Sequence, residues 1–133
     1  MTAYLLDTNH ASSLVTLRHH LRQRYFATAQ AGHEFAICIP VLAEVLFGLG
    51  LLPRAEANRQ EWQQLRQQIN CYQVEEIDAN QAAELQILLR RKGWKLDTID
   101  AMIAAIALRY DLILLTSDKD FSAIPNLKTE NWR

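Results

Sequence analysis

The stretch Thr98–Asp118 reads TIDAMIAAIALRYDLILLTSD and carries the strongest structural signal in the chain. Its first part, residues 98–110, is apolar at most positions, which predicts a helix that is buried on most of its sides. Its second part, Leu112–Thr116, is a short and almost continuous apolar run. Runs of this kind between helical segments are typical of strands in a buried parallel sheet. The stretch therefore predicts a helix that leads into a buried parallel strand.

Apolar runs and helical patterns alternate over the rest of the chain as well. The other expected strands are Ala3–Leu6, Phe35–Ile39, Cys71–Ile77 and, as a short edge strand, Leu127–Glu130. The other expected helices are Leu17–Ala31, Val41–Leu49, Pro53–Ile69 and Asn80–Lys92. This alternation predicts an α/β fold of three layers with a parallel sheet. No Pro-, Gly- or Ser-rich tract interrupts it, so we expect residues 1–133 to form one domain.

Composition narrows the possible partners. The 133 residues are 50% hydrophobic and carry a net charge of −1, whereas a general nucleic-acid binder is usually basic. Any contact with nucleic acid must therefore use local patches. Two segments offer them: Arg18, His19, His20, Arg22 and Arg24 in one, and Arg90, Arg91, Lys92 and Lys95 in the other. A solvated helix face is the simpler explanation of either segment taken alone.

The sequence predicts a cytoplasmic protein with no membrane partner. No apolar stretch reaches the roughly 20 residues that span a bilayer, and the N-terminus lacks the features of a signal peptide. Cys38 and Cys71 have neither the spacing of a paired motif nor histidines nearby, so we expect neither a disulfide nor a zinc site.

Four acidic residues occupy the positions at which α/β folds build their sites. Ligands in such folds bind beyond the carboxyl ends of the strands, where the strand order reverses. Asp7 closes the first expected strand, and Asp118 follows the fourth. Glu44 lies one turn into the helix after the second strand, and Asp100 lies near the start of the most apolar helix.

Each acid also has a structural explanation. Asp7 could cap a following helix, and Asp118 could cap the turn before Phe121. Asp97 is a natural N-cap, which makes Asp100 the third helical residue and places its charge favourably for the helix dipole.

Glu44 is harder to explain structurally. It stands among apolar residues on nearly every face of its helix, so it needs a partner or an exposed rim, because burying an unpaired charge is costly.

The four acids together point to a metal ion. Two like charges about 4 Å apart repel by roughly 4 kcal/mol at an effective dielectric constant near 20. The sequence does not supply a matching lysine or arginine beside each of the four acids, so a cluster of these carboxylates would require a bound divalent cation. A ligand set made only of oxygen suits Mg²⁺ or Mn²⁺.

The same residues resemble the motifs of the PIN-domain family, and specifically of its VapC-type toxins. Residues 4–9 (YLLDTN) resemble the first motif, and residues 41–48 (VLAEVLFG) the second. Residues 100–105 (DAMIAA) resemble the third, and residues 115–118 (LTSD) with Phe121 the fourth. The segment from Pro125 to Trp132 is similar to the family's tail. Four motifs in order, spread over nearly the whole chain, make this a specific signal.

The resemblance implies a Mg²⁺-dependent (or Mn²⁺-dependent) endoribonuclease that is the toxin of a toxin–antitoxin pair. It implies an RNA substrate such as a structured transfer RNA or ribosomal RNA loop, a cognate antitoxin, a homodimer, and a parallel sheet of order 3-2-1-4-5. The implied catalytic and metal-binding acids are Asp7, Glu44, Asp100 and Asp118, of which Glu44 could act through water. The implied supporting residues are Thr8, Asn9, Thr116 and Ser117.

Three residues depart from the family pattern. His10 stands where the family often has an aliphatic residue, and a structural role is commoner than a functional one for a lone histidine. Asp97 is an extra acid near Asp100, which we interpret as the N-cap. Asp120 is an additional acid in the fourth motif, which we leave outside the metal ligands.

Two other functions remain open at the level of sequence. A phospho-acceptor receiver domain also places aspartates at strand ends, but it needs an adjacent acid pair after the first strand, where this chain has Asp7 followed by Thr8. A catalytically silent PIN scaffold would bind RNA or protein without cleaving, although the presence of all four acids argues against it. A nucleotide-binding enzyme is disfavoured, because the four glycines form no phosphate-binding loop.

Overall fold

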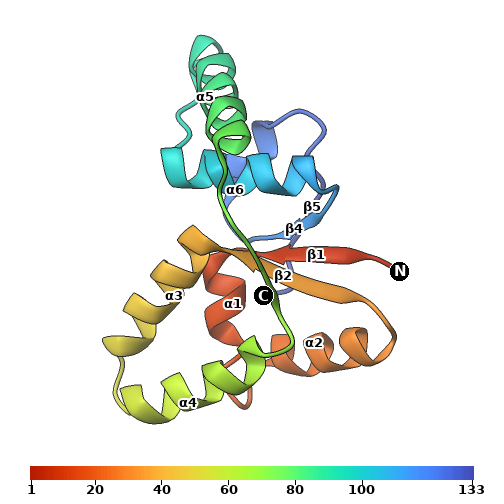
Figure 1. Ribbon diagram of the computed structural model, residues 1–133, viewed down its shortest axis with the longest axis vertical. Coiled ribbons are helices and arrows are strands. Elements are labelled where there is room, and N and C mark those ends of the chain that lie inside the picture. The colour runs from red at the N-terminus through yellow and green to blue at the C-terminus, as the bar shows by residue number, and fades with distance from the viewer.

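A computed structural model describes residues 1–133 as a five-stranded parallel sheet between two layers of helices (Figure 1). The strands are β1 (Ala3–Leu6), β2 (Glu34–Cys38), β3 (Asn70–Tyr72), β4 (Ile113–Leu115) and β5 (Thr129–Glu130). The helices are α1 (Thr8–Ser13), α2 (His20–Gln30), α3 (Ile39–Gly50), α4 (Ala55–Arg66), α5 (Glu76–Arg91) and α6 (Thr98–Arg109), with a 3₁₀ helix η1 at Lys119–Ala123.

The strand order is β3-β2-β1-β4-β5, which confirms the expected order 3-2-1-4-5. All four strand pairs are parallel, and β1 lies between β2 and β4. The chain leaves β1 in one direction and later returns to its other side, so the order reverses beside this strand. A receiver-type domain has the order 2-1-3-4-5, and the observed order therefore excludes that alternative.

The helices cover both faces of the sheet. Helices α5 and α6 lie on one side, and α1 to α4 lie on the other (Figure 1). Helix α6 is the most enclosed of them, because Ala101 and residues 103–107 are all buried, as its apolar sequence predicts. In β4, Leu114 and Leu115 are both fully buried although their side chains point to opposite faces. No helix is both long enough and apolar enough to cross a lipid bilayer.

Two elements differ from the expectations. Helix α1 is a single short helix of six residues with a polar sequence, so it gives no helical periodicity in the sequence. The expected strand Cys71–Ile77 is wrong in its second half, because β3 ends at Tyr72 and α5 begins at Glu76. A capping box between Glu75 and Asp78 starts this helix four residues before the predicted Asn80.

The C-terminal segment is held against the N-terminal part of the chain. The backbone N–H of Trp132 donates to Nε2 of the buried His10 (3.0 Å), and the Trp132 carbonyl accepts a hydrogen bond from His20 (2.9 Å). The guanidinium of Arg24 lies 4.0 Å from the centre of the Trp132 ring system. His10 is fully buried, and its place in this contact assigns it a structural role.

Candidate metal centre

The carboxyl ends of β1 and β4 bring the first and fourth motifs together. Leu6 pairs with Leu115 in the sheet, so Asp7 and Thr116 leave the two strands side by side. The Asp7 N–H extends the pairing by donating to the Leu115 carbonyl (3.0 Å). The sheet register therefore places the Asp7 carboxylate next to the segment that carries Asp118.

A buried threonine joins these two acids. The Thr116 hydroxyl donates to Oδ2 of Asp7 (2.7 Å) and accepts a hydrogen bond from the backbone N–H of Asp118 (3.0 Å). Thr116 is only 5% exposed, so burial limits the freedom of this hydroxyl. The contact sets the position of both carboxylates at once.

Both capping interactions that the sequence suggested are present as well. Oδ1 of Asp7 accepts the N–H of Thr8 (2.8 Å) at the start of α1, and Oδ1 of Asp118 accepts the N–H of Asp120 (2.9 Å) at the start of η1. The caps orient these carboxylates and do not remove them from the cluster, because Oδ2 of Asp118 makes no hydrogen bond within the protein and an oxygen that accepts one can still bind a cation.

Glu44 reaches the same place from α3. Its carboxylate accepts a hydrogen bond from the hydroxyl of Thr8 (2.8 Å), the residue that follows Asp7. Glu44 is exposed, so its carboxylate lies at the rim of the fold and its charge is not buried.

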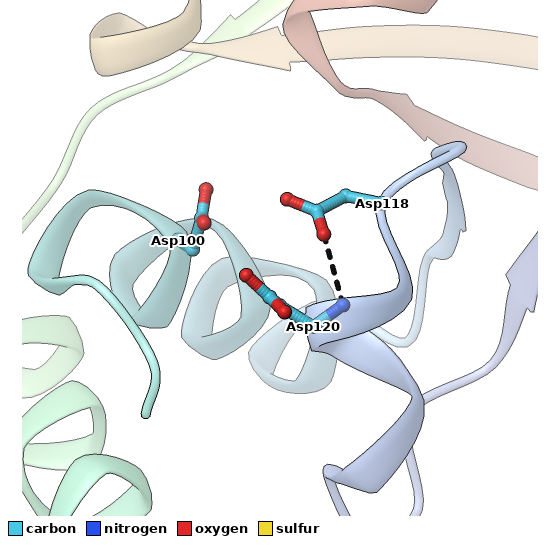
Figure 2. Close-up of side chains that lie close together, drawn as sticks. All are labelled: Asp100, Asp118 and Asp120. Carbon is cyan, nitrogen blue, oxygen red and sulfur yellow. Dashed lines mark hydrogen bonds between the residues drawn. The ribbon is translucent and has the colours of Figure 1, made fainter. Parts of the chain in front are cut away.

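The carboxylates of Asp100, Asp118 and Asp120 face a common space between α6 and η1 (Figure 2). One oxygen from each lies within 4.8 Å of the others. Asp120 is the residue that the sequence interpretation left outside the ligand set. The signal for it was available, because a cap at Asp118 turns the chain so that the carboxylate two residues later comes back beside it.

The cluster shifts the pKa values of its members. Burial, and then the charges of Asp7 and Asp118, raise the pKa of Asp100 to about 7. Burial also raises the pKa of Asp7, although its hydrogen bonds from Thr116 and Thr8 act in the opposite direction. A substantial fraction of Asp100 is therefore protonated near neutral pH unless a cation joins the site.

No basic side chain neutralises these acids. The four ion pairs of the protein are Arg22–Glu61, Arg109–Glu75, Arg109–Asp78 and Lys128–Asp111. None of them includes Asp7, Glu44 or any of the three clustered aspartates. The local excess of negative charge has no protein partner.

The donor set fits a small, hard divalent cation. Every candidate ligand is a carboxylate oxygen, which suits Mg²⁺ or Mn²⁺ and does not suit zinc or copper. Oxygens that bind one Mg²⁺ at about 2.1 Å lie roughly 3–4 Å apart, and the aspartate oxygens, which lie within 4.8 Å of one another, are near enough to close on such an ion. The attraction of each carboxylate to a bound cation would outweigh the Coulomb repulsion between the carboxylates.

The remaining predicted residues contribute less. The side chains of Asn9 and Ser117 are exposed and make no hydrogen bond within the protein. Asp97 occupies the N-cap position of α6 as predicted, but its side chain makes no capping hydrogen bond. Its charge is one of those that raise the pKa of Asp100.

The sequence of this chain is similar to a known family and to two named proteins. A family model described as PIN domain matches residues 4–127. Ribonuclease VapC2 of Rickettsia felis is 28% identical over 135 residues, and the match covers 97% of each protein. Ribonuclease VapC4 of Mycobacterium tuberculosis is 29% identical over 100 residues, which cover 74% of this chain and 77% of that protein.

A solved structure has the same fold along almost the whole chain. VapBC2 from Rickettsia felis, bound to a DNA fragment from its promoter, matches with a TM-score of 0.86 at 24% identity. The match covers 99% of this chain and all of the other. The arrangement of the sheet and its two helical layers is therefore a shared one.

Proposed function

This chain belongs to the PIN-domain family, and we propose on that premise that it is a metal-dependent endoribonuclease of the VapC type, the toxin of a toxin–antitoxin pair. One observation carries the proposal: carboxylates from four separate parts of the chain meet at the carboxyl ends of β1 and β4 without any basic partner. We propose that residues 1–133 form a single ribonuclease domain around this site.

We propose that Asp7, Asp100 and Asp118 hold a Mg²⁺ or Mn²⁺ ion directly and that Glu44 holds it through water or holds a second ion. Asp120 joins this set because its carboxylate lies with those of Asp100 and Asp118. Such an ion, when bound, lowers the pKa of a coordinated water and offsets the charge that develops on the phosphate oxygens.

The other residues of the chain orient these ligands. Thr116 fixes Asp7 against the backbone of Asp118, and Thr8 holds Glu44 through its hydroxyl. Contacts of this kind keep carboxylates in a geometry suited to the ion before it arrives. No histidine is needed as a general base, and the nearest one in sequence, His10, is used by the C-terminal segment.

RNA is the proposed substrate, because two proteins similar in sequence to this chain are named ribonucleases. Attack by a water molecule in line with the phosphodiester would leave a 5′-phosphate and a 3′-hydroxyl. Single-stranded loops of transfer RNA or ribosomal RNA suit such a site, since their bases can be splayed away from a helix.

The test is whether RNA cleavage depends on a divalent ion. The purified protein should cleave total RNA in Mg²⁺ or Mn²⁺ and lose at least about 10³-fold of that activity in EDTA, because the ion contributes several kcal/mol to the transition state. Sequencing of the ends should find 5′-phosphates. Cleavage that persists in EDTA, or no cleavage in either metal, contradicts the proposal. A silent scaffold predicts the second result.

We further propose that a cognate antitoxin binds along the exposed side of α3. Phe47 in α3 and Leu51, the C-cap residue of this helix, are 70% and 71% exposed, and their spacings of three and seven residues from Glu44 place them on its side of the helix. A partner that covers these apolar side chains therefore reaches the acidic site and blocks it. The VapC resemblance also implies a homodimer.

Replacing both Phe47 and Leu51 by alanine should weaken antitoxin binding about ten-fold or more, because the two truncations remove apolar area that the partner would bury. Titration of the co-purified antitoxin against each toxin variant measures this effect. RNA cleavage without antitoxin should not change. Ile77→Ala on α5 is the control, since Ile77 is 59% exposed and lies in the opposite layer. Equal weakening by both variants would refute the assignment to α3.

A further inference from the structure

A hollow of about 600 Å³ lies between the end of α5, the connecting residues 92–97 and the start of α6. Arg90, Arg91 and Lys95 contribute three positive charges to its wall, and Asp97 contributes one negative charge. The indole of Trp94 provides an aromatic surface beside them. The wall thus combines cationic groups with an aromatic ring.

This hollow adjoins the acidic cluster. The indole N–H of Trp94 donates to the backbone carbonyl of Asp120 (3.2 Å), whose carboxylate is part of that cluster. On the other side, Asp97 lines the hollow as the N-cap of α6 and precedes Asp100 by three residues, a spacing at which side chains at the start of a helix are neighbours.

The connection that forms the hollow is held in place by hydrogen bonds. The side-chain amide of Gln86 donates to the Leu96 carbonyl (3.0 Å) and to the Thr98 hydroxyl (3.1 Å). The backbone N–H of Trp94 donates to the Leu89 carbonyl (2.9 Å), which is possible because Gly93 adopts a left-handed conformation with φ of 78°. A preformed site costs less ordering on binding.

The three positive charges in the hollow are unpaired, whereas two arginines of the other basic segment are already engaged. None of Arg90, Arg91 and Lys95 takes part in an ion pair. In the segment 18–24, by contrast, Arg22 pairs with Glu61 (2.6 Å) and Arg24 lies over Trp132. Only the second segment therefore combines unpaired cations with a place beside the acids.

We propose that this hollow binds a nucleotide of single-stranded RNA next to the scissile phosphodiester, with a base against Trp94 and phosphates at Arg90, Arg91 and Lys95. The inference rests on the proposed ribonuclease function and extends it by naming where the substrate strand runs. Stacking on an exposed aromatic ring and cationic contacts to phosphates are the usual means of holding a single strand.

Trp94 offers a direct optical test. It is 38% exposed, whereas the other two tryptophans, Trp62 and Trp132, are 1% and 4% exposed. In an Asp7→Asn background without metal, a single-stranded hexaribonucleotide should quench the tryptophan emission as it binds. The quenching should disappear in Trp94→Phe, although this variant should still bind the oligonucleotide. Equal quenching in the two proteins overturns the proposal.

Affinity measurements with a dye-labelled hexaribonucleotide separate stacking from a structural role of Trp94. Trp94→Ala should weaken binding about ten-fold or more, and Trp94→Phe by less than about three-fold, because phenylalanine keeps the stacking surface and loses only the hydrogen bond to Asp120. If Trp94→Phe binds as weakly as Trp94→Ala, the indole N–H matters and the stacking proposal is wrong.

The phosphate contacts have their own signature. Arg90→Gln with Arg91→Gln should weaken binding and reduce the slope of log affinity against log salt by about 1.4, at roughly 0.7 for each phosphate contact. The matched control is Arg54→Gln with Arg59→Gln, which removes the same charge at α4 in the opposite layer (Figure 1). Equal slopes in the two double variants overturn the assignment.

Failure of this inference differs from failure of the ribonuclease proposal. A protein that cleaves RNA, but binds the oligonucleotide equally well with and without the Trp94 and Arg90/Arg91 substitutions, overturns the nucleotide site alone. A protein that shows the Trp94 quenching but cleaves no RNA in any divalent metal supports the nucleotide site and overturns the proposed activity.

Discussion

Replacing Asp100 by asparagine should abolish RNA cleavage and, in metal-free buffer above neutral pH, raise the melting temperature of the protein. The loss of cleavage should be about 10³-fold or more, because a ligand of the proposed ion is removed and several kcal/mol of transition-state stabilisation go with it. One substitution is thus expected to damage function and improve stability.

The gain in stability follows from the pKa of Asp100, which burial and the charges of Asp7 and Asp118 raise to about 7. In the unfolded chain this carboxyl titrates near its ordinary value of 3.8. Between these two values the folded protein binds the additional proton, so stability falls as pH rises and the full penalty is present above pH 7. After allowance for solvent screening, the penalty is about 1–2 kcal/mol, or roughly 3–8 °C in melting temperature.

Melting curves between pH 4 and pH 8 in EDTA measure this effect. The difference between Asp100→Asn and the wild type should be small at the acidic end and should grow toward neutrality. Mg²⁺ should raise the melting temperature of the wild type more than that of the variant. The control is Asp111→Asn, an exposed position with φ of 54° that asparagine also tolerates. A pH-independent difference would contradict the assignment.

Replacing His10 by alanine should destabilise the protein by about 2–4 kcal/mol at pH 7 without affecting the chemistry of RNA cleavage. The imidazole is fully buried, and its loss leaves both a cavity and an unpaired backbone N–H at Trp132. A change in the rate of cleavage by the remaining folded protein would instead give His10 a functional role.

The His10 contact also predicts a loss of stability in acid. Because Nε2 accepts the Trp132 N–H, the proton of the neutral ring sits on the buried Nδ1, and a second proton on Nε2 would break the hydrogen bond. Burial, followed by the charges of Arg133 and His19, lowers the pKa of His10 from 6.5 to about 4. The unfolded chain therefore binds more protons between these values, and stability falls by up to about 3 kcal/mol as pH drops from 6.5 to 4.

His10→Leu and His33→Ala make this prediction specific. Leucine fills the site without a titrating group, so the melting temperature of His10→Leu should fall less in acid than that of the wild type. His33 also accepts a backbone N–H, from Thr2 (2.9 Å), but it is only half-buried, and its replacement should cost less than about 1 kcal/mol. Parallel acid profiles of the wild type and His10→Leu would refute the role of His10.

The long apolar segments could be placed from the sequence, and the short polar ones could not. The Thr98–Asp118 stretch predicts both α6 and β4 almost to the residue, because burial on most sides leaves an apolar pattern that no loop would show. Helix α1 gives no signal in the sequence because five of its six residues are polar and carry no helical period. The start of α5 resembles a strand in sequence because it is set by a cap and not by an apolar pattern.

The candidate site divides in the same way. Asp7, Glu44, Asp100 and Asp118 are visible in the sequence because each stands beside an apolar segment of recognisable type. The sequence signal for Asp120 is the cap at Asp118, but the turn after β4 is what brings their carboxylates together. Thr8 and Thr116 are implied as supporting residues by the family resemblance, and the structure adds their partners Glu44, Asp7 and Asp118. The two basic segments look alike in sequence, and only the partners of Arg22 and Arg24 distinguish them from Arg90 and Arg91.

The sequence by itself determined which residues form strands and helices and which acids stand at their ends, since local apolar patterns and caps are properties of neighbouring residues. Only the tertiary structure decided which charges meet. Asp7 and Asp118 are joined by the pairing of β1 with β4, and Glu44 by the packing of α3 near Thr8. Coulomb energy depends on distance in space, and distances between remote residues are set by the sheet register and the packing of the core.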